Sequence, residues 1–210
     1  MHNVYIVGAG AQGRVVYGQM IHDLEHNVHW KICGFLDDRK TILAGYGIPL
    51  QIVGDPFTYV PKSDDVFVCA LGSTDHRKHY AAPLIAKGAK FMNVFTEIYA
   101  GSNLKLGDGV FFERNVRIGP DCSIGNFVNL NSLSILGHDI TVGDFSQIGS
   151  FVFVGGGVQI GEGVTIYAHA CILPGIKIGN NAVIGAGSVV IRDVPAGVTM
   201  FGNPAKRLVG

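Results

Sequence analysis

A histidine followed directly by an aspartate, His138–Asp139, is the pair in this sequence best suited to proton transfer. An imidazole titrates near neutral pH, and an adjacent carboxylate can orient the ring and raise its basicity. Eighteen residues further on lies Gly156, between Gly155 and Gly157, where no side chain shields the backbone amides. A bare amide can polarise an acyl carbonyl and hold the oxyanion that develops during attack. A base and an oxyanion donor placed together are suited to acyl transfer, whereas the competing interpretation is an exposed histidine beside a glycine-rich turn.

A six-residue repeat determines how far apart these residues lie. From Leu106 to Val190 in steps of six, all fifteen positions are aliphatic or Phe, and glycine follows ten of them. The residue four places after each step is small or β-branched, and the frame has no insertion. Neither a helical period of about 3.6 nor simple alternation fits this pattern. It predicts a parallel β-helix in which three hexads form one triangular coil, with five coils over this span.

The predicted coil places residue n directly over residue n+18, about 4.8 Å away. His138 is third in its hexad and should project at a corner, one coil from Gly156. His169 is fourth in its hexad and should stack between Phe151 and Gly187, in a surface or subunit-contact role. These are the only two histidines in the repeat region, so a zinc site built from three histidines is not expected, and no metal is predicted.

The first ninety residues instead alternate strand and helix, which predicts a small parallel sheet with flanking helices. The expected strands cover residues 3–7, 30–36, 66–71 and 90–94, and the expected helices cover 14–26 and a segment ending near 87. The fold class is therefore a half-Rossmann α/β domain, residues 1–97, followed by the β-helix and its tail, residues 98–210.

A glycine-rich turn between the first strand and the first helix has the GxGxxG spacing of Gly8, Gly10 and Gly13, with Gln12 inside it. Such a turn lets a phosphate approach the backbone at a helix N-terminus. Asp37, at the end of the second strand, can accept hydrogen bonds from a ribose or a base. A nucleotide-linked substrate is favoured over a redox dinucleotide, because half of a doubly wound fold cannot make a full dinucleotide site. A purely structural glycine turn is the other alternative.

Two further segments that follow predicted strands, one at Asp38 and one at Gly72 and Ser73, could either bind a ligand or have only a structural role. Asp38 either joins Asp37 in binding or is an exposed turn residue. Gly72 and Ser73 open a second helix at the end of a strand, where such sheets bind ligands. Ser73 can equally be an ordinary helix cap.

Composition excludes several classes of protein. Sixteen basic and sixteen acidic residues cancel, so nucleic acid and anionic membrane surfaces are not expected partners. No apolar run reaches the roughly 18 residues of a membrane span, and the first residues lack the features of a signal peptide. We therefore expect a cytoplasmic protein, with its four scattered cysteines reduced.

Several segments together resemble the bacterial nucleotide-sugar acetyltransferases, including the UDP-bacillosamine and perosamine N-acetyltransferases and the sialic acid O-acetyltransferases. The segments are VGAGAQG, GFLDD, LGSTDHRKHY, LNSLSILGHDITVGDFSQIGS and FGNPAKRL. The resemblance covers nearly the whole chain and implies a homotrimer of left-handed β-helices that uses acetyl-CoA. It also implies that His138 removes a proton from a sugar amine, that Asp139 supports His138, and that the Gly156 amide meets the thioester carbonyl.

The resemblance further assigns the binding residues. It implies that the nucleotide sugar is held by Gly8 to Gly13, by Asp37 and Asp38, and by the stretch after Gly72. Gly155 and Gln147 are expected to contact CoA, although relatives often carry histidine where this chain has Gln12 and Gln147. Lys206 and Arg207 either meet CoA phosphates or form a solvated basic tail.

These inferences predict an acetyl-CoA-dependent N-acetyltransferase that acts on a nucleotide-linked amino sugar. Acetylation of a sugar hydroxyl by the same fold is the first alternative. A non-catalytic scaffold that senses nucleotides is the second.

Overall fold

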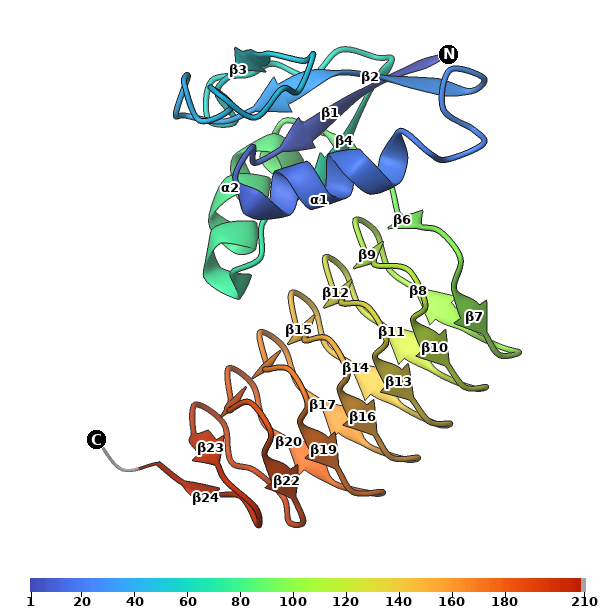
Figure 1. Ribbon diagram of the computed structural model, residues 1–210, viewed down its shortest axis with the longest axis vertical. Helices are drawn as coiled ribbons and strands as arrows, with labels where there is room; N and C mark the ends of the chain where they lie inside the picture. The colour runs from blue at the N-terminus through green and yellow to red at the C-terminus, as the bar shows by residue number, and fades with distance from the viewer. Residues whose placement is uncertain (209–210) are drawn as a thin grey trace. The chain divides into compact units, whose positions relative to one another are not determined.

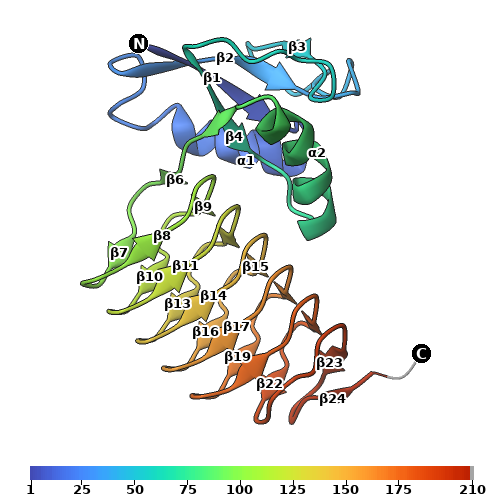
Figure 2. The ribbon, with the colours of Figure 1, turned by 180° about the vertical axis from the view of Figure 1, so that it is seen from behind.

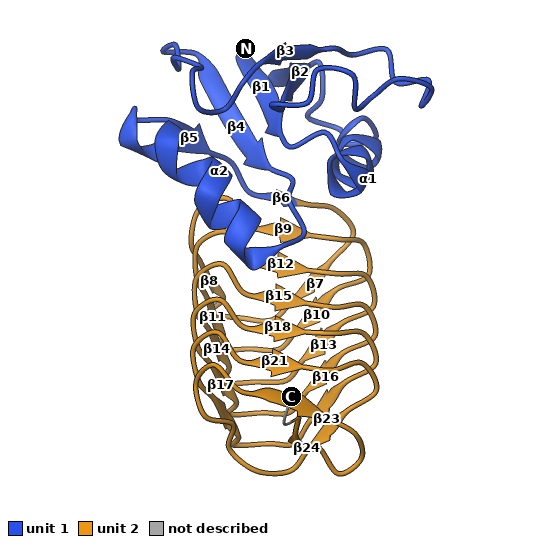
Figure 3. Cartoon of the chain, turned by 90° about the vertical axis from the view of Figure 1, so that its left-hand side faces the viewer, with its two compact units in different colours: residues 1–94 blue, residues 95–210 orange. Residues whose placement is uncertain are grey.

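The computed structural model describes residues 1–208, which divide into two compact units (Figures 1 and 3). The first unit is residues 1–94, and the second begins at Phe95. The division falls three residues before the boundary expected at 97/98, because Val94 and Phe95 already form the first strand of the β-helix. Within the described residues, no helix is long and apolar enough to cross a membrane.

The first unit is a five-stranded parallel sheet in the order β3-β2-β1-β4-β5, with two helices. Its elements are β1 (His2–Val7), α1 (Ala11–Met20), β2 (Trp30–Leu36), β3 (Ile52–Gly54), β4 (Asp65–Cys69), α2 (Thr74–Ala86) and β5 (Lys90–Phe91). Strand β3 was not expected, and α1 begins three residues earlier and ends six residues earlier than predicted. Hydrogen-bonded turns such as His22 N–H to Gln19 O replace the last expected turns of that helix.

The position of β1 in the middle of the sheet brings three loops to one edge. β1 pairs with β2 on one side and with β4 on the other, both in parallel. Because the three strands run the same way, the segments that follow Val7, Leu36 and Cys69 leave the same edge. This edge carries the glycine turn, the acidic pair and the Gly72 loop that were predicted to bind a ligand.

The second unit is a three-sided β-helix (Figure 2). Its first face contains β6 (Val94–Phe95), β9 (Phe111–Phe112), β12 (Asn129–Leu130), β15 (Gln147–Ile148), β18 (Thr165–Ile166), β21 (Val183–Ile184), β23 (Thr199–Phe201) and β24 (Lys206–Arg207). Its second face contains β7 (Tyr99–Ala100), β10 (Arg117–Ile118), β13 (Ile135–Leu136), β16 (Phe153–Val154), β19 (Cys171–Ile172) and β22 (Val189–Val190). Its third face contains β8 (Lys105–Leu106), β11 (Ser123–Ile124), β14 (Thr141–Val142), β17 (Gln159–Ile160) and β20 (Lys177–Ile178).

Each coil of the β-helix contains eighteen residues, as predicted. Ile118 pairs with Leu136, and Leu136 pairs with Val154, in parallel register. The repeated aliphatic positions and the small residues four places later form one continuous buried core. The β-helix begins two hexads before the repeat found in the sequence, since β6 joins the first face and Ala100 pairs in the same register with Ile118. Ala100 is exposed and lies outside the buried core, so the aliphatic pattern does not reach back to these strands.

Candidate functional site

His138 and Asp139 form a contact at a corner of the β-helix. The chain leaves β13 at Leu136, and Asp139 adopts a left-handed backbone conformation with φ of 55°. Its Oδ2 lies 2.6 Å from Nδ1 of His138. Because a carboxylate only accepts hydrogen bonds, the proton of a neutral His138 ring lies on Nδ1, and Nε2 carries a free lone pair. Both side chains are about two-thirds exposed in the single chain, 66% and 64%, so Nε2 is open to a reactant.

Gly156 lies directly against the His138 ring, one coil further along. A β-carbon built on Gly156 would lie 2.5 Å from Nε2 and 2.6 Å from Cε1 of His138. Any larger residue at position 156 would therefore displace the ring. The predicted proximity of His138 and Gly156 is present in the structure.

The three glycines above His138 differ in how their amides are used. Gly155 N–H donates to Ile172 O at 2.9 Å, and Gly157 N–H donates to His138 O at 2.8 Å. Gly156 N–H has no acceptor among residues 1–208. A main-chain donor without an internal acceptor therefore belongs to the residue that lies against the His138 ring, and such a donor can stabilise negative charge on a carbonyl oxygen.

The other residues singled out in the β-helix lie away from this corner. Gln147, on β15, donates from Nε2 to Asn131 Oδ1 at 2.6 Å. No sequence pattern selects Asn131, since its pairing with Gln147 depends on the fold. His169 stacks on Phe151 with ring centroids 4.8 Å apart and planes 2° apart, which confirms the predicted stacking. Across the described chain, no three His, Cys, Asp or Glu side chains converge in a way that could hold a metal ion.

The glycine turn of the first unit is tightly packed. Gly8 has φ of 95°, and a β-carbon on Gly13 would overlap the carbonyl oxygen of Gly8. Gly10 is the N-cap residue of α1 and supplies no side-chain cap. The first turn of α1 contains no acidic residue, so its positive end is not offset there. The turn therefore has the shape and the electrostatic character of a phosphate site.

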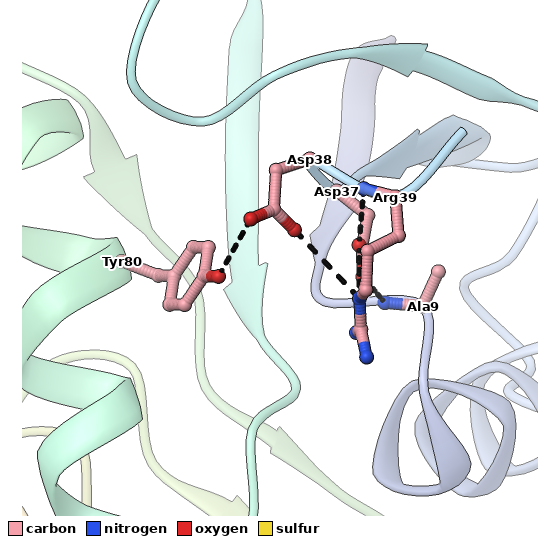
Figure 4. Close-up of polar contacts among 5 residues, drawn as sticks. All are labelled: Ala9, Asp37, Asp38, Arg39 and Tyr80. Carbon is pink, nitrogen blue, oxygen red and sulfur yellow. Dashed lines mark hydrogen bonds and ion pairs between the residues drawn. The ribbon is translucent and has the colours of Figure 1, made fainter. Parts of the chain in front are cut away.

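Asp37 is buried, and its carboxylate is already occupied by donors from the protein (Figure 4). Oδ2 accepts from Ala9 N–H at 2.8 Å and from Arg39 Nη2 at 2.9 Å. Oδ1 accepts from the main-chain N–H and from Nε of Arg39, both at 2.9 Å. Burial works to raise the pKa of Asp37, but the hydrogen bonds from Arg39 and Ala9 outweigh it and hold the pKa below its usual range. Asp37 thus ties the glycine turn to the end of β2, and its predicted contact with a ligand stays a prediction.

Asp38 is the more accessible of the two carboxylates. Its side chain is 41% exposed, and its Oδ2 accepts from the hydroxyl of Tyr80, on α2, at 3.0 Å (Figure 4). Arg39 Nε lies 3.7 Å from Asp38 Oδ1. Burial, followed by the hydrogen bond to Asp38, raises the pKa of Tyr80, which therefore stays a donor. Asp38 has more capacity than Asp37 to accept a hydrogen bond from a ligand.

The loop between β4 and α2 is held by a buried arginine. Arg77 is fully buried, and its Nη1 donates to Leu71 O at 2.9 Å and to Gly72 O at 2.8 Å. Burial lowers the pKa of Arg77 to about 10. Ser73 is the N-cap residue of α2, and its Oγ accepts from His76 N–H at 3.4 Å. The capping alternative for Ser73 is therefore present, and Arg77 is a residue that sequence reasoning missed.

The basic tail borders a cleft at the end of the β-helix. Strand β24 pairs antiparallel with β23, so Lys206 lies opposite Phe201. A cleft of about 410 Å³ is lined partly by Arg192, Asp193, Met200, Pro204, Lys206 and Arg207. Three cations and one carboxylate give this cleft a net positive lining, which suits an anionic group.

Comparisons with known proteins bear on both units. Residues 3–84 match the family model of the PglD N-terminal domain, and residues 157–192 match the bacterial transferase hexapeptide model. The whole chain superposes on PerB from Caulobacter crescentus, solved with CoA and GDP-perosamine, with a TM-score of 0.86. Identity to PerB is 25%, over 100% of this chain and 98% of that chain. The chain is an acetyltransferase with a left-handed β-helix fold.

A second solved structure shares the fold of this acetyltransferase over nearly the whole chain. The acetyltransferase domain of PglB from Neisseria gonorrhoeae matches with a TM-score of 0.89 at 22% identity, over 99% of this chain and 100% of that domain. A structure of the same domain with acetyl coenzyme A matches at 24% identity, with a TM-score of 0.88 and coverage of 99% of each chain. At these identities the likeness to PglB establishes the shared two-unit fold. Among curated protein sequences, no significant match was found.

Proposed function

We propose that this acetyltransferase transfers an acetyl group from acetyl-CoA to the amine of a nucleotide-linked amino sugar. The observation that carries the proposal is the contact between the free Nε2 of His138 and the unshielded backbone of Gly156. A base and an oxyanion donor on adjacent coils match the two demands of amide formation from a thioester.

The proposed reaction is a direct attack that needs no acyl-enzyme. The sugar amine forms a C–N bond to the thioester carbonyl carbon, and its proton passes to Nε2 of His138. The tetrahedral oxyanion accepts a hydrogen bond from Gly156 N–H. When this intermediate collapses, the C–S bond breaks and the CoA thiolate takes the proton from His138, which leaves the acetamide and free CoA.

Asp139 supports this cycle by fixing the ring. The 2.6 Å contact to Nδ1 keeps Nε2 directed outward and stabilises the imidazolium that forms during proton transfer. Asp139 thus acts on the substrate only through His138.

We assign acetyl-CoA to the β-helix. Gly155 and Gly156 would border the thioester, and Gln147 would contact the cofactor from the first face. The positive cleft beside Lys206 and Arg207 supports their assignment to the CoA phosphates over a solvated tail. PerB, which shares the fold at 25% identity, was solved with CoA bound.

We assign the nucleotide to the carboxyl edge of the sheet in the first unit. The uncapped N-terminus of α1 beside Gly8, Gly10 and Gly13 would take the diphosphate. Gln12, Asp38 and the stretch at Gly72 and Ser73 would contact the rest of the nucleotide sugar. The GDP-perosamine in the PerB structure supports an amino sugar carried on a nucleotide.

We also propose that the active form is a homotrimer. Exposed apolar side chains recur from coil to coil along the second face and on both sides of it. They include Leu133, Ile135, Phe151, Phe153, Leu173 and Ile191, each between 39% and 51% exposed in the single chain. A contiguous apolar strip of this kind marks a protein–protein contact.

The test of the proposed function is a screen of acetyl-CoA consumption against UDP-, GDP- and dTDP-linked amino sugars, with product masses measured. A gain of one acetyl group on the sugar amine supports the proposal. Acetylation of a hydroxyl would indicate the O-acetyltransferase alternative. Nucleotide binding without CoA release from any donor–acceptor pair would indicate a non-catalytic scaffold.

A further inference from the structure

At one corner of the β-helix, side chains cap the main-chain amides of the coil before them. Asn126 Oδ1 accepts from Asp108 N–H at 2.9 Å, and Asp144 Oδ1 accepts from Asn126 N–H at 2.8 Å. Asn180 Oδ1 accepts from Glu162 N–H at 3.0 Å. In all three pairs both residues are third in their hexads, and the acceptor follows the donor by eighteen residues. A short polar side chain at the third position therefore closes the amide beneath it.

The corner that carries His138 has the same geometry but a different set of residues. Its third positions are Pro120, His138, Gly156 and Pro174 in successive coils. By the eighteen-residue relation, the amide of Gly156 would be capped by the side chain of residue 174. Proline has no side-chain acceptor, so this amide has no acceptor among residues 1–208.

The backbone at residue 174 is close enough for such a cap to form. A β-carbon built on Gly155 would lie 2.6 Å from Pro174 N and 2.8 Å from Pro174 Cδ. Gly175 N–H donates to Gly156 O at 2.9 Å, which keeps the two coils in the usual register at this point. An asparagine at 174 would thus stand to Gly156 as Asn180 stands to Glu162.

We propose that Pro174 is a positioning residue that keeps the Gly156 N–H free for the thioester carbonyl. This inference rests on the proposed function, since it concerns the same oxyanion donor. Pro174 acts by what it lacks: any short side-chain acceptor at this position would occupy the donor before acetyl-CoA arrives. It touches no reacting atom.

Pro174→Asn tests this directly. The amide of Gly156 should exchange with solvent deuterium quickly in the wild-type enzyme and many-fold more slowly in P174N, as followed by NMR. In P174N, kcat should fall on the order of a hundredfold or more, the loss typical of removing one oxyanion donor. The KM for the nucleotide sugar should not change. Pro174→Asp, which copies the cap made by Asp144, provides a second capping variant should P174N fold poorly.

Two further variants separate the effect of the side-chain acceptor from the effect of changing the shape of residue 174 or of losing a cap elsewhere. Pro174→Leu has nearly the shape of the asparagine variant without its acceptor, so it should retain at least tenfold more kcat than P174N and keep fast exchange at Gly156. Asn180→Ala frees the amide of Glu162 at a different corner, and should lower Tm while leaving kcat unchanged.

The outcomes separate this inference from the proposed function. Slow exchange at Gly156 in P174N together with wild-type kcat would overturn the inference and leave the acetyltransfer intact. Unchanged fast exchange in both P174N and P174D would overturn the capping relation itself. A wild-type enzyme that acetylates no amino sugar would instead remove the proposed function.

Discussion

The link between His138 and Asp139 depends on one backbone angle. Adjacent residues in an extended strand point to opposite sides, but the left-handed conformation of Asp139 turns its short side chain back to Nδ1 at 2.6 Å. Aspartate tolerates this conformation better than most residues. The corner of the coil therefore creates the pair that the adjacent letters in the sequence only suggested.

Replacing the imidazole tests the chemistry at this corner. His138→Ala should reduce kcat on the order of a hundredfold or more, because the general base is lost. His169→Ala is the matched control, since it removes the only other histidine of the repeat region and should keep kcat near the wild-type value. Initial rates of CoA release would measure both, and near wild-type activity in H138A would remove His138 from the mechanism.

The lowered pKa of Asp37 predicts how acid acts on the first unit. A carboxyl group whose pKa is lower in the folded state than in the unfolded state stabilises the fold above the unfolded pKa, and that stabilisation is lost as pH falls through the folded pKa. Asp37→Asn should therefore lower Tm at pH 7 but have much less effect in strong acid. Circular dichroism melts of both proteins from pH 7 downward would measure this, and an equal Tm difference at every pH would contradict it.

At the scale of elements, the six-residue repeat could be predicted from the sequence because the narrow core of each coil accepts only apolar side chains. Thirteen of the repeated positions, from Ile118 to Val190, are fully buried, so apolar residues are required there. Strands β6 and β7 escaped notice because Ala100 is exposed and the aliphatic pattern does not extend to it. Strand β3 (Ile52–Gly54) is too short to carry a pattern.

The candidate site was predictable only in part. The one-coil relation placed Gly156 against His138, and the glycine spacing placed the turn before α1. The donors that occupy Asp37 come from Ala9 and Arg39, and the hydrogen bond from Ala9 spans 28 residues. Such contacts depend on how β1 and β2 lie side by side, which no local pattern in the sequence records.

Replacing Arg77 should weaken the binding of only one of the two substrates. Arg77→Met should raise the KM for the nucleotide sugar several-fold, because the loop at Leu71 and Gly72 loses its anchor. The KM for acetyl-CoA and kcat should change little, since the transfer residues lie in the β-helix. Steady-state kinetics with each substrate varied in turn would show the split.

Lys87 offers the matched control for that variant. It lies at the other end of α2 and also binds two carbonyls, Phe57 O at 2.7 Å and Tyr59 O at 2.9 Å. Lys87→Met should lower Tm without raising either KM. An equal rise in the nucleotide-sugar KM in both variants would show that Arg77 is only a structural residue, and R77K should recover part of the lost affinity.

At the scale of the whole molecule, the apolar strip on the second face predicts self-association. Ile135 and Phe153 are 40% and 44% exposed in the single chain and pair in adjacent coils. Replacing both with glutamate should place two like charges where copies meet and yield a monomer. Light scattering after gel filtration would measure the mass of the assembly.

An exposed position on another face controls for added charge. Gln159→Glu, on the third face, should leave the mass unchanged. If the wild-type chain itself is monomeric at micromolar concentration, the trimer proposal is wrong.

Each coil of the β-helix adds about 4.8 Å along its axis, so equivalent positions in different coils are separated by multiples of this rise. The spacing from His138 to the basic tail can change only by whole coils, because removing one or two hexads would shift the following strands onto different faces. Deleting one complete eighteen-residue coil between them would bring His138 and the basic tail closer by about 4.8 Å and leave the local structure of both unchanged. In the proposed complex, the distance that acetyl-CoA must span from His138 to the basic tail is therefore set by the number of complete coils between them.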